Sequence, residues 1–457
     1  MKKLSVLNPY DQSVIEEFEF YSQEKIHEIF EESYLFFKNH KYLKKQKRIE
    51  ILKKFKELLI REKTRLVDQA IAEGGKPRVH TEIEIERGIS GVDGVITALE
   101  TLSGKEIPMN LSRSSEGKYA YTHYEPRGLC LALSAFNHPF NLAIHQVLPC
   151  VAAGAPVIIK PSLATPRSSL SVIELLRESG LPKEAAQWIL CEDSVVENLV
   201  SDPRIASLNF IGSSKVGWKL RSKVNPGATV TLEHGGVAPL IIDETSDWKT
   251  LLPQVIMGCF YHAGQVCVST QKIFVNDSIY NEFKKEFLSA VQLIQSGDPS
   301  ATQTLVGPLI RKSAIERVDA WVKEAISMGA TLLCGGKKES EMVYAPTVVE
   351  SVPNQARLAS EEVFGPVVTL ESYQDFEEVI QKVNDLPYAF QSAVLTKHID
   401  RMKIAMERIK AQTLLFNEHT AFRVDWMPFG GYQDSGLGLG GFDHAIKDQS
   451  IEKLIIF

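Results

Sequence analysis

Short apolar segments alternate with amphipathic segments between residues 128 and 235, and this alternation constrains the fold more than any other feature of the sequence. Parallel strands joined by crossover helices produce such a pattern. We therefore expect an α/β fold around a parallel sheet, with ligands bound beyond the carboxyl ends of the strands. The expected strands are 129–133, 157–160, 187–190 and 207–211, and the expected helices run to about 153 and over 168–179.

A second α/β region is predicted over 237–435, and the 457 residues suffice for two or three domains. Residues 23–75 are predicted to be an amphipathic helix. The segments 110–125 and 451–457 are polar and β-like, so we expect them to pair as a small appended sheet that serves subunit contacts. Within 237–435 the expected helices are 246–263, 278–295, 312–328 and 374–384, and the expected strands are 271–275, 364–370 and 392–396.

Composition excludes several classes of protein. The formal net charge of −6 argues against a nucleic-acid partner. The longest apolar region, 128–160, contains polar residues that fit a buried core better than a membrane span. The six cysteines are scattered without a C-x-x-C pair, so neither a metal site nor a disulfide framework is expected. With no apolar leader at the N-terminus, these features predict a cytoplasmic protein.

Two glycine-containing segments are candidates for phosphate binding. Gly436-x-Gly438-x-x-Gly441 matches a dinucleotide fingerprint, but only 16 residues follow it, too few for a βαβ unit. The segment 210–214 is the better candidate, because an expected strand ends at Gly212 and Ser213 begins a helix whose N-terminus attracts phosphate. Helix capping by the serine hydroxyl is the alternative.

Two further residues carry candidate chemistry. Glu233 lies between an apolar run and Gly235-Gly236, where burial would raise its pKa and make it a base. Cys267 follows the loop residues Gly264-Gln265-Val266 and is a candidate nucleophile. Taken singly, a turn glutamate and a buried structural cysteine are the simpler interpretations.

These residues belong to seven short motifs that occur in one order along the chain. The series resembles that of the aldehyde dehydrogenase superfamily, and the resemblance extends from about Asn8 to the end. The motifs are Phe136-Asn137-His138-Pro139, Ile159-Lys160-Pro161-Ser162, Phe210-Ile211-Gly212-Ser213-Ser214, Leu232-Glu233-His234-Gly235-Gly236, Gly264-Gln265-Val266-Cys267, Glu361-Glu362-Val363-Phe364-Gly365-Pro366 and Pro428-Phe429-Gly430-Gly431.

The resemblance implies a particular architecture and chemistry. A Rossmann-like NAD(P)-binding domain would comprise 1–109 and 128–235, an α/β catalytic domain 236–436, and a small β oligomerisation flap 110–127 and 437–457, in a homodimer or homotetramer. Cys267 would attack the aldehyde as a thiolate, with Asn137 in the oxyanion hole. Hydride transfer would leave a thioester, which water activated by Glu233 would hydrolyse.

The resemblance also implies the cofactor contacts. Lys160 would contact the adenosine ribose, Ser213 the pyrophosphate, and Glu362 the nicotinamide ribose. Further contacts are expected at Phe136, Pro161, Ser162, Gly212, Val216 and Phe364. Many NAD-preferring relatives have glutamate where this chain has Leu163, and Lys215 replaces a frequent glutamate. The expected cofactor is therefore NAD or NADP.

Other departures concern the substrate. Ala135-Phe136 replaces the usual Pro-Trp before the catalytic asparagine, and His234 either tunes Glu233 or fills space. Phe429 is expected beside the substrate. Arg423 either binds a carboxylate or phosphate of the substrate or pairs with Asp425 within its own loop. Lactaldehyde, glyceraldehyde 3-phosphate, a semialdehyde or an aromatic aldehyde is compatible with this loop.

Three other functions remain as alternatives. A coenzyme-A-acylating dehydrogenase would generally lack the water-activating glutamate, so Glu233 argues against it. A non-catalytic protein on the same fold would have no need of Cys267, Asn137, Glu233 and Glu362 together. A cysteine hydrolase would not require the cofactor motifs.

Overall fold

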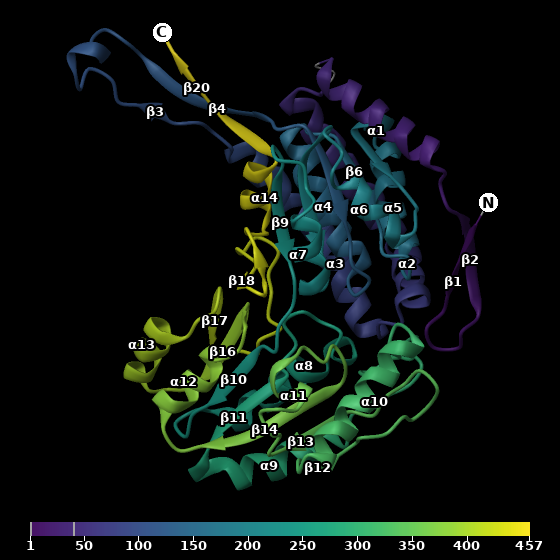
Figure 1. Ribbon diagram of the computed structural model, residues 1–457, viewed down its shortest axis with the longest axis vertical. Coiled ribbons are helices and arrows are strands. Elements are labelled where there is room, and N and C mark those ends of the chain that lie inside the picture. The colour runs from purple at the N-terminus through teal and green to yellow at the C-terminus, as the bar shows by residue number, and fades with distance from the viewer. Residues whose placement is uncertain (1, 40–41) are drawn as a thin grey trace.

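A six-stranded sheet organises the first half of the molecule (Figure 1). Its strands are parallel except for β19 at one edge, which is antiparallel to its neighbour β9. We describe residues 2–39 and 42–457 of a computed structural model. In spatial order the strands are β19 (Gly436–Leu437), β9 (Thr229–Glu233), β8 (Ile205–Ile211), β5 (Leu129–Leu133), β6 (Val157–Lys160) and β7 (Ala186–Trp188).

Helices cover both faces of this sheet, which explains why its central strands are apolar at every position. In β5, Cys130 and Ala132 face one core while Leu129 and Leu131 face the other. The first core lies under α2 (Lys45–Gly74), α3 (Arg78–Thr101), α4 (Pro139–Ala153), α5 (Pro166–Glu178) and α14 (Phe442–Asp448). The second lies under α1 (Gln23–Lys38), α6 (Asp193–Leu199) and α7 (Ser214–Arg221).

A seven-stranded sheet organises most of the rest, and only its edge strand β12 runs antiparallel. In order it comprises β12 (Thr331–Cys334), β13 (Thr347–Glu350), β14 (Val367–Tyr373), β11 (Lys272–Asn276), β10 (Pro239–Ile242), β16 (Gln391–Leu395) and β17 (Thr413–Phe416). One face packs on α8 (Trp248–Phe260), α9 (Asp277–Val291), α10 (Lys312–Ser327) and α11 (Arg357–Ser360), and the other on α12 (Phe376–Asn384) and α13 (Ile399–Arg408).

The segments expected to form an appended sheet do pair with each other. β20 (Ser450–Ile456) runs antiparallel to β4 (Ala120–Pro126), which also pairs with β3 (Glu106–Ile107). Figure 1 shows this sheet extending away from the rest of the chain. Two two-stranded sheets complete the strands: β1 (Lys3–Leu7) with β2 (Val14–Glu19), and β15 (Tyr388–Ala389) with β18 (Tyr432–Gln433).

The structure divides the expected helix 23–75, and it also ends the expected helix 246–263 at Phe260, where the left-handed turn 261–264 begins. α1 ends at Lys38 with Asn39 as its C-cap, and α2 begins only at Lys45 after extended backbone at Lys44. Residues 40 and 41 lie outside the described part of the chain. The break lets α1 and α2 cover opposite faces of the six-stranded sheet, which one continuous helix cannot do.

Among the described residues, none of the helices combines the length and the apolar character that a membrane span requires.

Candidate active site

A cavity of about 990 Å³ opens at the carboxyl ends of the strands of the six-stranded sheet. Residues at the ends of β6, β8 and β9 line one side, and residues from the loop before β11 and the loop before β14 line the other. The connection 234–238 carries the chain from β9 to β10 and so joins the two sheets beside this cavity. Such a position suits a ligand that contacts both halves of the molecule.

Cys267 enters the cavity from a turn of unusual backbone conformation. His262, Ala263 and Gly264 have φ values of +49°, +55° and +69°, in the left-handed region. A side chain at Gly264 would collide with the carbonyl oxygen of Gly365, so glycine is required there. Cys267 is partly exposed to the cavity while Val266 and Val268 on either side are buried. The turn therefore presents one thiol and hides its neighbours.

Burial raises the pKa of the Cys267 thiol well above its ordinary value, and the negative charge of Glu233 raises it further, while Arg423 lowers it. The thiol therefore needs a proton acceptor before it can act as a thiolate. Burial also raises the pKa of Glu233, the last residue of β9, and Arg423 opposes that rise. A carboxylate with a raised pKa is the better proton acceptor.

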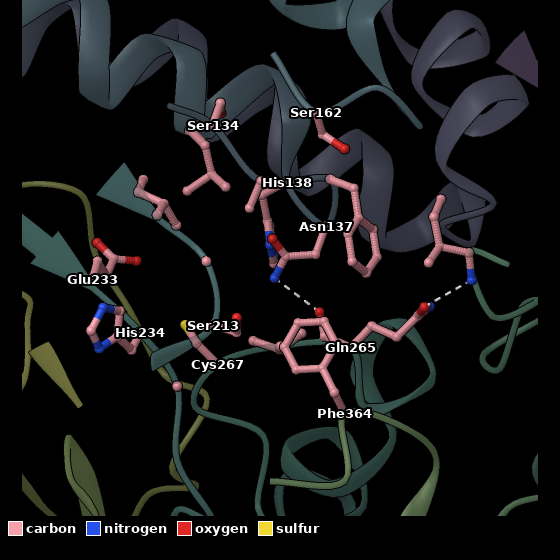
Figure 2. A pocket seen from close by; sticks show the side chains of 18 of the residues that line it. Ser134, Asn137, His138, Ser162, Ser213, Glu233, His234, Gln265, Cys267 and Phe364 are labelled. Atoms are coloured by element: carbon pink, nitrogen blue, oxygen red, sulfur yellow. Dashed lines mark hydrogen bonds between the residues drawn. The ribbon is translucent and has the colours of Figure 1, made fainter. Parts of the chain in front are cut away.

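Asn137 lies just before α4 and points toward the Cys267 loop (Figure 2). Its Nδ2 atom donates a hydrogen bond to the carbonyl oxygen of Gln265 at 2.9 Å. Gln265 is itself fixed, because its Oε1 atom accepts a hydrogen bond from the backbone N–H of Ile310 at 3.0 Å. An amide nitrogen carries two hydrogens, so one remains for a substrate oxygen.

A second, small cavity of about 30 Å³ lies behind Glu233. Gln146, Asn209, Thr231 and Asp448 supply polar walls. The Oε1 atom of Gln146 is buried and has no hydrogen-bond partner among the described residues. A polar cavity of this size has room for about one water molecule.

Two of the residues expected to contact the cofactor lie at the ends of β6 and β8. Lys160 is 5% exposed and donates a hydrogen bond from Nζ to Asp193 Oδ1 at 2.7 Å. Ser213 is the N-cap residue of α7 by position, but its hydroxyl makes no capping hydrogen bond. The backbone N–H groups of Ser214 and Lys215 have no acceptor among the described residues. The capping alternative for Ser213 is therefore wrong, and a set of unpaired donors remains.

Glu362 and Phe364 approach from the other side of the cavity. The N–H of Gly236 donates to Glu362 Oε1 at 3.3 Å, and burial raises the pKa of this carboxyl to about 8. The rings of Phe136 and Phe364 meet edge to face with centroids 5.8 Å apart. Phe364 has a φ of +44°, and Arg317 donates to the neighbouring Val363 carbonyl at 3.0 Å, which supports this bend.

Arg423 is not bound to Asp425, so that alternative is wrong for the described residues. Arg87 donates two hydrogen bonds to the Asp425 carboxylate at 3.1 and 2.7 Å, and His145 Nε2 lies 2.8 Å from it. The Arg423 guanidinium instead lies 3.6 Å from the centre of the Phe429 ring, and its buried Nε has no partner. The cavity therefore contains an arginine without a carboxylate bound to it.

Comparison with known proteins agrees with this geometry. The model of the aldehyde dehydrogenase family matches residues 1–455. The chain belongs to the aldehyde dehydrogenase family. It is 32% identical over 456 residues to 3-sulfolactaldehyde dehydrogenase of Priestia megaterium, covering 100% of this chain and 95% of that protein.

Two solved members of the family superpose on almost the whole chain. Aldehyde dehydrogenase 21 from Physcomitrella patens, in complex with succinate, has a TM-score of 0.97 and 30% identity, covering 100% of this chain and 95% of that one. Glyceraldehyde-3-phosphate dehydrogenase from Methanocaldococcus jannaschii, complexed with NADP, has a TM-score of 0.94 and 29% identity, covering 99% and 98%. The family therefore accounts for the two large sheets of this chain.

In this aldehyde dehydrogenase all but one of the residues proposed from the sequence line the large cavity. Pro161 is buried beside it, while the others lie on its wall: Phe136, Asn137, Lys160, Ser162, Gly212, Ser213, Val216, Glu233, Cys267, Glu362, Phe364, Arg423 and Phe429. His234 packs between Phe210 and Trp218, and its Nδ1 lies 2.9 Å from the Asp434 carbonyl oxygen. This arrangement supports a packing role for His234 over tuning of the neighbouring base.

Sequence reasoning missed several residues on the wall. Asp193, Glu197 and Lys219 line the end of the cavity near Lys160. Asp193 begins α6 shortly after β7, the strand next to β6. Because ligands bind beyond the carboxyl ends of parallel strands, its position after an expected strand could have identified it. His138 Nε2 and the Tyr261 hydroxyl lie 3.3 Å apart on the same wall; His138 stands in the Asn137 motif but was given no role, and no local pattern marks Tyr261.

Proposed function

We propose that this protein oxidises an aldehyde to a carboxylic acid, with NAD+ or NADP+ as the oxidant and water as the final acceptor of the acyl group. The observation that carries the proposal is the presence of Cys267, Asn137 and Glu233 on the wall of one cavity at the sheet edge. Oxidation through a thioester needs a nucleophile, an oxyanion donor and a base, and these three side chains supply them.

The hydrogen-bond donors at the carboxyl ends of β6 and β8 fit a dinucleotide. The unused Ser213 hydroxyl and the unpaired N–H groups at the start of α7 suit the pyrophosphate. Lys160 suits the adenosine ribose and Glu362 the nicotinamide ribose, as the family resemblance implies. When bound, the dinucleotide supplies the hydride acceptor. Phe136, Pro161, Ser162, Gly212, Val216 and Phe364 would shape its binding site.

The chain's own groups move the protons. Glu233 accepts the Cys267 proton and releases it to solvent, and Sγ then bonds to the aldehyde carbon. The resulting oxyanion accepts hydrogen bonds from the second N–H of Asn137 and from the Cys267 backbone N–H. After the carbon has lost its hydride, Glu233 takes a proton from water, which attacks the thioester. The C–S bond breaks, and Cys267 leaves with its electron pair and is protonated again.

Glu233 also weighs against the coenzyme-A-acylating alternative. Transfer to coenzyme A needs no base for water, whereas hydrolysis does. The raised pKa of Glu233 and the small polar cavity behind it both suit the activation of water. We therefore favour hydrolysis.

We propose further that the substrate is a small aldehyde with an anionic group. Arg423 is unpaired, lies on the cavity wall and is oriented by Phe429. A buried arginine without a carboxylate partner suits a carboxylate, sulfonate or phosphate. The relatives support this, since one is named for 3-sulfolactaldehyde and another was solved with succinate.

The test follows the formation of reduced cofactor by absorbance, across a panel of anionic and neutral aldehydes with each cofactor. Cys267→Ala should abolish turnover and leave cofactor binding intact. Glu233→Gln should still form one reduced cofactor per site, but more slowly than the wild type because Cys267 has lost its proton acceptor. The turnover that follows should be slower still and should lose the increase with pH that titration of Glu233 gives the wild type. Full activity in Cys267→Ala would refute the mechanism.

Arg423→Met tests the substrate class separately. Loss of a charge-assisted hydrogen bond should lower kcat/KM for anionic aldehydes by about 10- to 100-fold. Activity toward a neutral aldehyde of similar size should change little, which makes that aldehyde the matched control. An equal loss for both would refute the anion-binding role while leaving the chemistry intact.

We also propose a cytoplasmic homodimer or homotetramer whose subunit has the domain boundaries given above, except that α14 belongs with the first domain, whose core it fills. All six cysteines are unpaired, which suits a reducing compartment. Ile451, Leu454 and Ile456 on β20 are 44–52% exposed, and a second subunit would cover them. Light scattering coupled to size-exclusion chromatography should give at least twice the 51.0 kDa chain mass.

A further inference from the structure

The end of the cavity farthest along the dinucleotide from Cys267 would hold the adenosine ribose, if the proposed function is right. The hydride acceptor must lie beside Cys267, and the pyrophosphate beside the start of α7. The remaining part of the cavity is then the region between β6 and α6. Its wall consists of Lys160, Ser162 and Leu163 on one side and Asp193, Glu197 and Lys219 on the other.

Asp193 is the acid that faces Lys160. Its Oδ1 atom accepts a hydrogen bond from Lys160 Nζ at 2.7 Å, and its side chain is 83% exposed. Lys160, by contrast, is held at the end of β6 with only 6% of its side chain exposed. The amine is therefore fixed, and the carboxylate is free to turn toward a ligand while it stays near that amine.

The other charges at this end leave Asp193 uncompensated apart from Lys160. Glu197 is bound by Lys219 and also by Lys223, so these lysines are already engaged. Leu163, at the position where many NAD-preferring relatives have glutamate, contributes no charge. Lys215 does not lie on the wall. On the wall itself, Lys160 and Lys219 balance Asp193 and Glu197, and Lys223 behind the wall adds one positive charge to the Glu197 pair.

We propose that Asp193 makes this enzyme prefer NAD+ to NADP+, and so takes the role of the absent glutamate from a different strand end. A carboxylate accepts a hydrogen bond from the ribose 2′-hydroxyl of NAD+, which is how acids at the strand ends of such sheets select NAD+. The 2′-phosphate of NADP+ would bring its charge against Asp193 and compete with it for Lys160.

Calorimetric titration of the aldehyde-free enzyme with NAD+ and with NADP+ tests this inference. Asp193→Asn removes the charge and keeps the shape, so it should bind NADP+ about tenfold more tightly, a change of about 1.4 kcal/mol. Its affinity for NAD+ should fall or stay the same. The gain for NADP+ should shrink at high salt, because a repulsion between exposed charges is screened.

Glu192→Gln is the matched control. Glu192 is the neighbouring acid, but it pairs with Lys2 and does not line the cavity. It should leave the ratio of the two dissociation constants unchanged. An unchanged ratio in Asp193→Asn, or tighter binding of NADP+ than NAD+ by the wild type, would overturn the inference and leave the proposed oxidation standing. Failure of the wild type to bind either dinucleotide would instead overturn the proposed function as well.

Discussion

Replacement of Glu362 by glutamine should stabilise the cofactor-free protein at alkaline pH. Burial raises the pKa of this carboxyl from 4.5 to about 8, so the folded protein favours the protonated form. The stabilisation of the folded protein by protonated Glu362 is complete below pH 4.5. It falls as the pH rises above 4.5, because the unfolded carboxyl then ionises first, and it is lost once the pH has risen through 8. At about 1.4 kcal/mol per pH unit, the loss has an upper limit of about 5 kcal/mol. Because the cavity admits water, we expect about half of that limit.

The assay is urea unfolding of both proteins at pH 6 and pH 9 without cofactor. Subtracting the free energy of unfolding of the wild type from that of the variant at each pH removes the contribution of other groups that titrate in this range. Glu73, whose pKa burial raises to about 7, is one of them. Glu362→Gln should gain at pH 9, relative to wild type, about 1–1.5 kcal/mol more than it gains at pH 6, because part of the loss has already occurred by pH 6. Parallel pH profiles would refute the reasoning, since they would mean that Glu362 is ionised in the folded protein at no cost.

Two further substitutions have distinct expected effects. Arg87→Met should lower the free energy of unfolding by about 3 kcal/mol in urea, because Asp425 loses its bidentate partner in a mostly buried site; a change below 1 kcal/mol would contradict this. Phe429→Leu should raise KM for anionic aldehydes about fivefold through the lost stacking on Arg423, with KM for neutral aldehydes as the internal control; equal changes for both classes would contradict it.

Much of the first sheet could be predicted because its strands are buried on both faces. The segments 129–133 and 157–160 coincide with β5 and β6, whose side chains are all buried. No helix was predicted over α3, since Gly88, Gly91 and Gly94 lower its helix propensity. Side chains at these glycines would collide with the rings of Phe140 and Phe442. Packing against distant aromatic residues, which local sequence does not reveal, thus determines this helix.

The same distinction applies to the site. Cys267, Glu233 and Asn137 belong to motifs, so the sequence could predict that they act together. The free state of Arg423 depends on Arg87 and His145, which bind Asp425 from positions 338 and 280 residues away. A loop sequence that contains both Arg423 and Asp425 suggests a local ion pair, and only the tertiary contacts remove that interpretation.

The pairing of β20 with β4 has a consequence for the synthesis of the chain. Thr122 on β4 bonds to Glu452 on β20 across 330 residues, and α14 fills the first core with Phe442 and Ile446. The ribosome must therefore release nearly the whole polypeptide before the N-terminal sheet can close its core and before the projecting sheet exists at all. A nascent or prematurely terminated chain lacks both, so the chain can reach its complete fold only after translation has ended.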